Sequence, residues 1–229
     1  MDEERSNQLG YSQQEYTRAI GQTLHDKYHL GFTVESLGAA YGNTKEDRLN
    51  AWVICDEGPY EGRKFLAQVS KCDLAVYDRY LSLEAGDRIA AKITALLGLE
   101  QGQVFCEADM DYTDASCSGP AREMAVTEQA GRLTVSCYIF LPRPADGEAA
   151  RIYELAQRLE AIETENLLAV FCFVQDLKAD YYGICADAPS DRRYETVMSL
   201  EELAEHCPVS LKDGKMKTSL EQIRQKVGK

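Results

Sequence analysis

The sequence predicts an α+β fold, with an antiparallel meander flanked by helices and then a β-α-β-β unit. Three observations support this class. Apolar residues recur at helical spacing in residues 12–28 and 83–97. Between these helices, short apolar or alternating runs are separated by Gly-, Asn- and Pro-containing loops, which are typical of strands joined by turns. In the second half, one strongly amphipathic helix lies between two apolar runs.

Residues 1–98 are expected to form an α-β-β-β-α unit. Ser12 and Glu15 have the spacing of a capping box, which predicts that the first helix begins there. Three strands are expected at 32–34, 52–55 and 65–69, and Gly98 ends the second helix. A sheet with one apolar face needs a helical cover, so we expect a domain boundary near residue 98.

Residues 99–229 are expected to form the β-α-β-β unit and a helical tail. The predicted elements of this unit are a short strand around Val104, a short helix opened by Pro120, a strand at 133–141, a helix capped at Asp146, and strands at 167–175 and 180–186. This order is that of half a ferredoxin-like sandwich, which carries no function by itself.

The tail is predicted to contain a short helix, Leu200–His206, which Pro208 breaks. The basic amphipathic stretch from Lys215 to Lys226 follows. We expect this stretch to dock on the body of the protein, and the alternative is a partner-binding tail.

The net charge of −13 excludes nucleic acid as a first hypothesis for the partner. Most of the excess lies in residues 99–187, where 16 acidic groups face 6 basic ones. The longest apolar run, Leu167–Val174, has eight residues against the roughly 20 that a membrane helix needs, so we expect no transmembrane segment.

The cysteines and the N-terminus bear on localisation. Eight cysteines occur without a small-domain disulfide pattern, and Cys55, Cys137, Cys172 and Cys185 fall in apolar runs. A secretory signal has a basic region followed by an apolar one, and the first residues of this sequence have neither. Reduced thiols in the cytoplasm are therefore expected, with an extracytoplasmic location if a signal segment has been removed.

Four carboxylates, those of Glu107, Asp109, Asp111 and Asp114, lie within eight residues and form the candidate metal site. Calcium and magnesium prefer oxygen ligands such as these. The spacing does not match an EF-hand loop, because a loop starting at Asp109 needs Glu at its twelfth position and Pro120 is there instead. A solvated acidic loop is the expected outcome, and no cofactor is expected; calcium or magnesium at these residues is the alternative.

Cys117 is the one candidate nucleophile, because it precedes the helix opened by Pro120 and a helix N-terminus can lower a thiol pKa. No histidine is placed near it by the sequence, so an inert thiol is expected. His25 and His29 lack the glutamate of a zincin motif and are expected to interact with a helix C-terminus. Phosphate-binding glycine loops and Cys-x-x-Cys pairs are absent.

Tyrosine is the commonest aromatic residue, with 13 copies against 6 Phe and 1 Trp. Tyrosine suits interfaces because it combines an apolar face with a polar tip. The candidate binding residues are Tyr41 and Tyr60 in loops, and Tyr181 and Tyr182 at a strand start. Packing in a core or at its rim is the alternative for each.

Several short runs resemble a pattern in uncharacterised small α+β proteins of Gram-positive bacteria. These runs are Lys27-Tyr28, Phe32-Thr-Val, Tyr41-Gly-Asn-Thr, Asn50-Ala-Trp-Val and Asp78-Arg-Tyr80, within about the first 85 residues. Many such proteins carry a lipoprotein signal, and no such pattern is expected from the first residues of this sequence. The resemblance implies a helix followed by a meander, and it implies no activity.

The leading hypothesis is a non-catalytic binding protein that contacts a protein partner or a second copy of itself through an open sheet. An exposed sheet edge offers backbone groups with which another strand can pair. The alternative is an enzyme of unrecognised type that depends on a divalent cation held by the acidic cluster.

Overall fold

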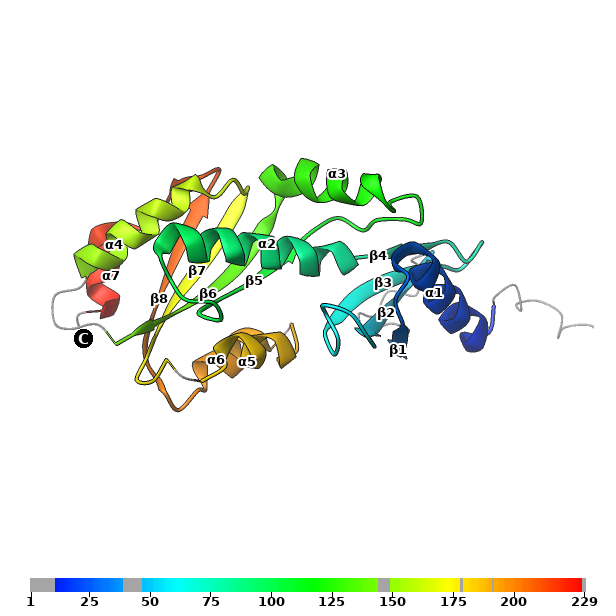
Figure 1. Ribbon diagram of the computed structural model, residues 1–229, viewed down its shortest axis with the longest axis horizontal. Coiled ribbons are helices and arrows are strands. Elements are labelled where there is room, and N and C mark those ends of the chain that lie inside the picture. Colours follow the sequence, from blue (N-terminus) through cyan, green and yellow to red (C-terminus); the bar gives the residue numbers. More distant parts are fainter. Residues whose placement is uncertain (1–10, 39–46, 144–148, 178, 191, 228–229) are drawn as a thin grey trace, which may run out of the picture. The chain divides into compact units, whose positions relative to one another are not determined.

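The computed structural model describes residues 11–38, 47–143, 149–177, 179–190 and 192–227. The chain divides into two compact units (Figure 1). The first unit contains residues 1–81 and 111–125, and the second contains 82–110 and 126–229. The α+β class and the antiparallel meander are confirmed, because helices accompany a four-stranded antiparallel sheet and a five-stranded mixed sheet.

The first unit is a helix packed on a meander. The helix α1 (Gln13–Tyr28) begins at the predicted capping box, in which the Ser12 side chain and the Glu15 side chain each accept a backbone hydrogen bond. The strands lie in the order in which they follow one another in the sequence, namely β1 (Phe32–Leu37), β2 (Arg48–Cys55), β3 (Lys64–Ser70) and β4 (Val76–Asp78). Neighbouring strands are antiparallel throughout.

Alternation along these strands places one face of the first sheet against α1. Val53, Phe65 and Ala67 are buried on this face, as are Ile20 and Leu24 of α1. The pattern follows from the period of two in a strand and of 3.6 in a helix. The helix and the sheet thus share one apolar core.

The five strands of the second sheet lie in the order in which they occur in the chain. They are β5 (Val104–Asp109), β6 (Thr134–Pro142), β7 (Asn166–Val174), β8 (Leu203–Lys212) and β9 (Lys215–Met216). Only β6 and β7 are parallel, since α4 (Ala149–Arg158) and a short 3₁₀ turn at Leu159–Ala161 connect them. Parallel neighbours require such a crossover.

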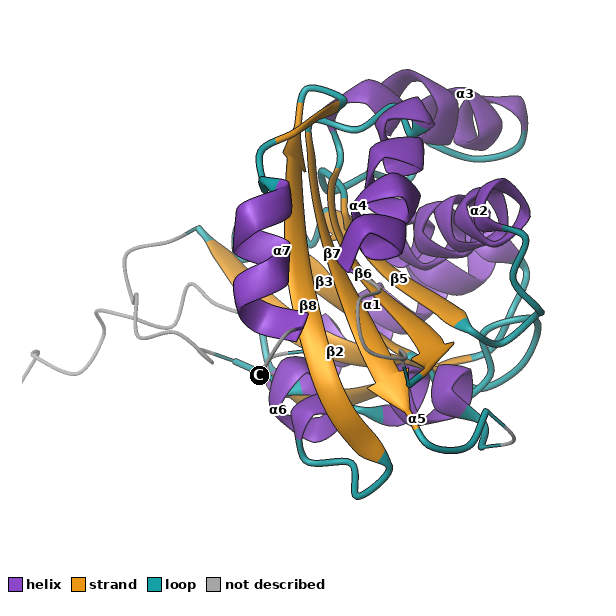
Figure 2. Cartoon of the chain, turned by 90° about the vertical axis from the view of Figure 1, so that its left-hand side faces the viewer, coloured by secondary structure: helices purple, strands orange, loops and turns teal. Residues whose placement is uncertain are grey.

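Helices cover the two faces of this sheet unequally. Against one face lie α2 (Tyr80–Leu97) and α4, with α7 (Leu220–Val227) beside α4 along the sheet (Figures 1 and 2). On the other side lie the short helices α5 (Tyr181–Asp187) and α6 (Arg193–Met198). The helix α3 (Pro120–Gln129), opened by Pro120 as predicted, and a 3₁₀ turn at Ala130–Arg132 precede β6.

The strand predicted at 180–186 is wrong, because this segment forms α5. Asp180 caps the helix by accepting a hydrogen bond from the Gly183 backbone N–H, and Tyr181 and Cys185 are buried one turn apart. A short apolar run is ambiguous between helix and strand, and here the cap decides for the helix. The last strand of the predicted β-α-β-β order is β8, which follows α6.

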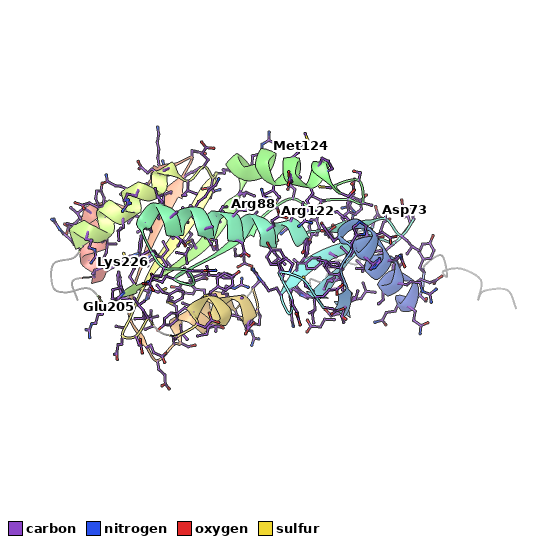
Figure 3. All side chains as sticks on the ribbon, viewed as in Figure 1. Asp73, Arg88, Arg122, Met124, Glu205 and Lys226 are labelled. Atoms are coloured by element: carbon purple, nitrogen blue, oxygen red, sulfur yellow. The ribbon has the colours of Figure 1, made fainter. Side chains whose placement is uncertain are left out.

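The helix predicted at 200–206 is also wrong, since residues from Leu203 onward belong to β8. Pro208 is tolerated in this strand because β9 pairs only with Leu211 and Lys212, so β8 is an edge strand at Pro208. The basic stretch forms β9 and then α7, which docks through the fully buried Ile223. Lys226, labelled in Figure 3, stays exposed.

The expected boundary near residue 98 lies within the second unit, because α2 from Ser82 onward clusters with the second sheet. Gly86 makes this packing close, since a Cβ there would lie 2.5 Å from the carbonyl oxygen of Cys106 in β5. The helix predicted from Asp146 is α4, although Asp146 itself lies outside the described residues.

All eight cysteines are free, and six of them are buried, including the four that were expected in strands or cores. Burial raises the pKa of Cys55 and Cys185 to about 12 and that of Cys207 to about 11. In the described part of the chain, no helix combines the length and apolar character of a membrane span.

Gly86→Ala is expected to destabilise the protein by about 1–3 kcal/mol, because the added methyl group meets backbone that cannot move aside cheaply. Gly21→Ala in α1 is the matched control, since a Cβ there meets nothing within 4 Å. This control is expected to stabilise by about 0.5–1 kcal/mol through helix propensity. Urea unfolding followed by circular dichroism measures both, and equal effects would contradict the close approach at Gly86.

Stability is expected to fall as the pH rises above about 9, because a buried thiol with a raised pKa keeps its proton in the folded state and loses it in the unfolded state. Each such thiol contributes up to about 1.4 kcal/mol per pH unit between the unfolded and folded pKa values. Cys207→Ala should reduce the slope by about that amount up to pH 11. Urea unfolding at pH 7, 9 and 10 under a reductant measures the slope, and an unchanged slope would contradict this origin.

Candidate functional site

The three described candidate tyrosines are divided between the two units. Tyr60 is buried in the first unit with its ring edge-on to that of Tyr80. Tyr181 is buried in the second unit and stacks on Phe140 at 4.5 Å, while the half-buried Tyr182 donates a hydrogen bond to Asp87. Tyr41 lies outside the described residues. These contacts give the three described tyrosines a packing role, and a binding role for them stays a prediction.

The four candidate carboxylates are divided between the two units. Glu107, near the end of β5, forms an ion pair with Arg193 and accepts a hydrogen bond from Ser190. Asp109 is exposed at the end of the strand, and Asp111 is exposed in the first unit. The Ser116 hydroxyl and backbone N–H lower the pKa of the exposed Asp114. Within the described residues, no group of three or more His, Cys, Asp or Glu could hold a metal ion.

Cys117 lies half-buried in the first unit, near the side chain of Lys27. Burial raises the pKa of the Cys117 thiol, and the opposing effect of Lys27 does not overcome it. A thiol that stays protonated at neutral pH is a weak nucleophile. His29 ends α1 with left-handed backbone, and its N–H donates to the His25 carbonyl.

The most deeply buried charges of the first unit meet at Asp78, at the end of β4. The Lys27 ammonium lies 2.7 Å from one carboxylate oxygen, and both side chains are only 1% exposed. Tyr28 donates a hydrogen bond to the other oxygen, which also accepts one from the backbone N–H of Tyr80. Burial and the adjacent carboxylate raise the pKa of the Tyr28 hydroxyl. A buried ion pair is stable only with such complete hydrogen bonding.

The same network holds a distant segment of the chain. The backbones of Asp78 and Thr113 exchange two hydrogen bonds, and Lys27 donates to the Thr113 hydroxyl at 2.9 Å. Arg122 of α3, labelled in Figure 3, has its guanidinium within 6 Å of the Tyr28 and Tyr80 rings, at 5.5 and 5.6 Å. The network therefore attaches residues 111–125 to α1 and β4.

Sequence reasoning did not single out this network as a site. Its residues lie in two of the runs that carry the resemblance, Lys27-Tyr28 and Asp78-Arg-Tyr80. A lysine on the apolar face of a predicted helix and an aspartate ending an apolar strand were the available signals. Neither signal predicts that Lys27 pairs with Asp78, because the two residues are 51 positions apart in the sequence.

The second unit has a sheet surface that its helices leave uncovered. On the face that carries α5 and α6, the rows of residues nearest these helices are apolar and buried, and include Phe105, Tyr138 and Val170. Two further rows on that face are polar or exposed. From β5 towards β9, the first row contains Glu107, Ser136, Leu168, Ser210 and Lys217. The second row contains Asp109, Thr134, Asn166, Lys212 and Lys215.

We call these two rows the open face. Residues from β6, β7, β8 and Lys217 line a hollow there of about 390 Å³, and the exposed Leu168 lies among them. Pockets of about 300–1,000 Å³ are typical of small-ligand sites. The Asn166 amide donates to the Thr134 hydroxyl at 3.3 Å, so hydroxyl and amide groups surround the leucine.

Charge is distributed unevenly across the open face. Glu107 at one side is paired with Arg193, whereas Lys212, Lys215 and Lys217 at the other side are exposed. None of the three lysines forms an ion pair with another described residue. The open face therefore has an available positive side and a largely neutral centre.

The outer face of the first sheet is the other candidate surface, and several of its polar side chains contact one another. Gln68 donates to Asn50 and accepts from Arg48, and the Arg48 guanidinium lies 3.8 Å from the centre of the Tyr77 ring. Trp52 is half-buried on this face. Groups that already have partners offer less to a ligand, which favours the open face of the second sheet.

Comparison with known proteins supports the fold alone. No protein-family model and no curated protein matches the chain. A solved structure, a DUF5037 family protein from Ruminococcus gnavus ATCC 29149, is similar with a TM-score of 0.56 and 13% identity. The match covers 91% of this chain and 97% of that one. The similarity to an uncharacterised protein thus extends over both units.

Asp78→Asn is expected to destabilise the protein by about 3–5 kcal/mol, because it leaves the Lys27 ammonium buried without a counter-charge. Asp26→Asn, whose carboxylate is 65% exposed, is the control and should change stability by less than about 0.5 kcal/mol. Urea unfolding followed by Trp52 fluorescence reports on the first unit, since this is the only tryptophan.

The double variant Lys27→Met/Asp78→Asn is expected to be more stable than Asp78→Asn alone. It removes both charges, and the asparagine can still accept the Tyr28 hydrogen bond. A double variant less stable than either single one would contradict the ion-pair interpretation.

Proposed function

We propose that the protein is a non-catalytic binding protein and that the open face of the second sheet is its binding surface. The main support for this proposal is the hollow around the exposed Leu168, beside which lie the unpaired Lys212, Lys215 and Lys217. An apolar centre with a few oriented polar groups is the usual composition of a ligand site. The raised pKa of Cys117 also favours a non-catalytic role.

The ligand we propose is an extended peptide with an apolar side chain and an acidic one. The apolar side chain would cover Leu168, and the carboxylate would meet Lys212 and Lys217. These lysines lie one to two strands away from Leu168, or roughly 5–10 Å at the usual strand spacing. Side chains two residues apart on an extended peptide are roughly 6.5–7 Å apart and point to the same face, so an apolar and an acidic residue at that spacing fit both positions.

A second copy of the chain is a less suitable ligand for this surface. The helices α5 and α6 cover the adjoining part of the same face, so two sheets cannot approach to the roughly 10 Å of direct sheet packing. A narrow chain beside the helices avoids this obstacle. We further propose a reducing compartment, as in the cytoplasm, because all eight thiols are free.

Fluorescence anisotropy with two labelled peptides, Ser-Leu-Ser-Glu and Ser-Leu-Ser-Lys, tests the proposal, because side chains two residues apart on an extended chain point to the same face. The acidic peptide is expected to bind at least about tenfold more tightly, and its affinity should fall as salt rises, because exposed charges are screened. Lys212→Glu/Lys217→Glu should reverse the preference, and Leu168→Asp should weaken binding of the acidic peptide. Lys92→Glu, on the exposed side of α2, is the control.

Three outcomes would overturn the proposal. The first is equal affinity for the two peptides, and the second is binding that the double lysine variant leaves unchanged. The third is turnover of a substrate that a single substitution abolishes, since this would make the protein an enzyme.

A further inference from the structure

Cys106 of β5 and Cys137 of β6 lie directly opposite each other in the second sheet. Gln103 and Phe140 lie opposite each other three residues further along in the same register. The Phe140 N–H donates to the Gln103 carbonyl at 2.8 Å, so these two residues are a hydrogen-bonded pair. Hydrogen-bonded and non-hydrogen-bonded pairs alternate along antiparallel strands. Cys106 and Cys137 are therefore a non-hydrogen-bonded pair, the type in which opposite side chains are closer.

The geometry of such a pair suits a disulfide. The Cα atoms of a non-hydrogen-bonded pair are about 4.5 Å apart, and disulfides span Cα distances of about 4.4–6.8 Å. Both thiols are buried and free, and burial together with the neighbouring Cys106 raises the pKa of the Cys137 thiol. The remaining strand cysteines face other residue types across their pairs, since Cys55 faces Phe32, Cys172 faces His206, and Cys207 faces Phe171.

We propose that Cys106 and Cys137 are an oxidisable pair that closes into a cross-strand disulfide when oxidised glutathione or an equivalent disulfide is available. One protein thiolate attacks the glutathione disulfide and releases one reduced glutathione. The other thiolate then attacks the mixed disulfide and releases the second. Two protein thiols are thus oxidised, one glutathione disulfide is reduced, and the two protons leave on the two glutathione thiols.

Access to the buried thiols depends on β5, which pairs on one side only, with β6. Opening of an edge strand breaks fewer hydrogen bonds than opening of a central one. Burial raises the pKa of Cys137, so little thiolate is present at neutral pH. Exchange is therefore slow in the folded protein and faster at pH 8 or during refolding.

The disulfide would enclose residues 107–136, a loop that contains the 111–125 segment of the first unit. Enclosing a loop of this length restricts the unfolded chain and raises thermal stability. The pair would thus report the redox state of the surroundings through the stability of the whole chain.

The experiment equilibrates the full chain in glutathione buffers at pH 8, both folded and during refolding from urea. Free thiols are then alkylated and the peptides identified by mass spectrometry. We expect a Cys106–Cys137 cross-linked peptide in the oxidising buffer and a thermal midpoint at least about 5 °C above that of the reduced chain. Cys106→Ser and Cys137→Ser should abolish the shift, and Cys172→Ser should retain it.

Two results would overturn the proposal. One is a pair that stays reduced after refolding with excess oxidised glutathione, while the exposed Cys72 forms a mixed disulfide. The other is a cross-link found mainly between different cysteines. The unmodified sequence gives both readouts, so the test does not depend on a variant that folds.

Discussion

The alternation of side chains across the second sheet is the constraint from which its other features follow. One face of β6 and β7 is apolar along its whole length, with Val135, Ile139 and Phe171 buried, and α2, α4 and α7 can therefore lie along it. The other face changes from apolar to polar halfway along the strands, so α5 and α6 cover only its apolar part. The open face is what remains, and its hollow exists because the sequence places Ser136 and Asn166 there.

In the first unit, a buried ion pair is the interaction on which the arrangement of the other elements depends. Lys27 lies in a helix and Asp78 at the end of a strand, far apart in the sequence. The two charges can be buried together because Tyr28 and Thr113 complete their hydrogen bonding. This network also attaches the 111–125 segment to its unit. Its charges stabilise the structure of the first unit.

Much of the fold could be predicted, because period and capping are local properties. The capping box at Ser12 and the strand at 167–175, observed as Asn166–Val174, were predicted from the sequence for that reason. The segment at 180–186 was assigned the wrong class because its short apolar run suits either a helix or a strand, and only the local cap at Asp180 distinguishes them. The segment at 200–206 was assigned the wrong class because the edge position that tolerates Pro208 depends on strand pairing. The open face and the ion pair were missed for the same reason: strand register brings their residues together.

Amide chemical-shift mapping by NMR with the acidic peptide locates the binding surface residue by residue. We expect shifts concentrated at the backbone amides of residues 134–136, 166–168 and 210–217, which form the open face and its basic side. Shifts concentrated around Trp52 on the outer face of the first sheet would contradict this expectation.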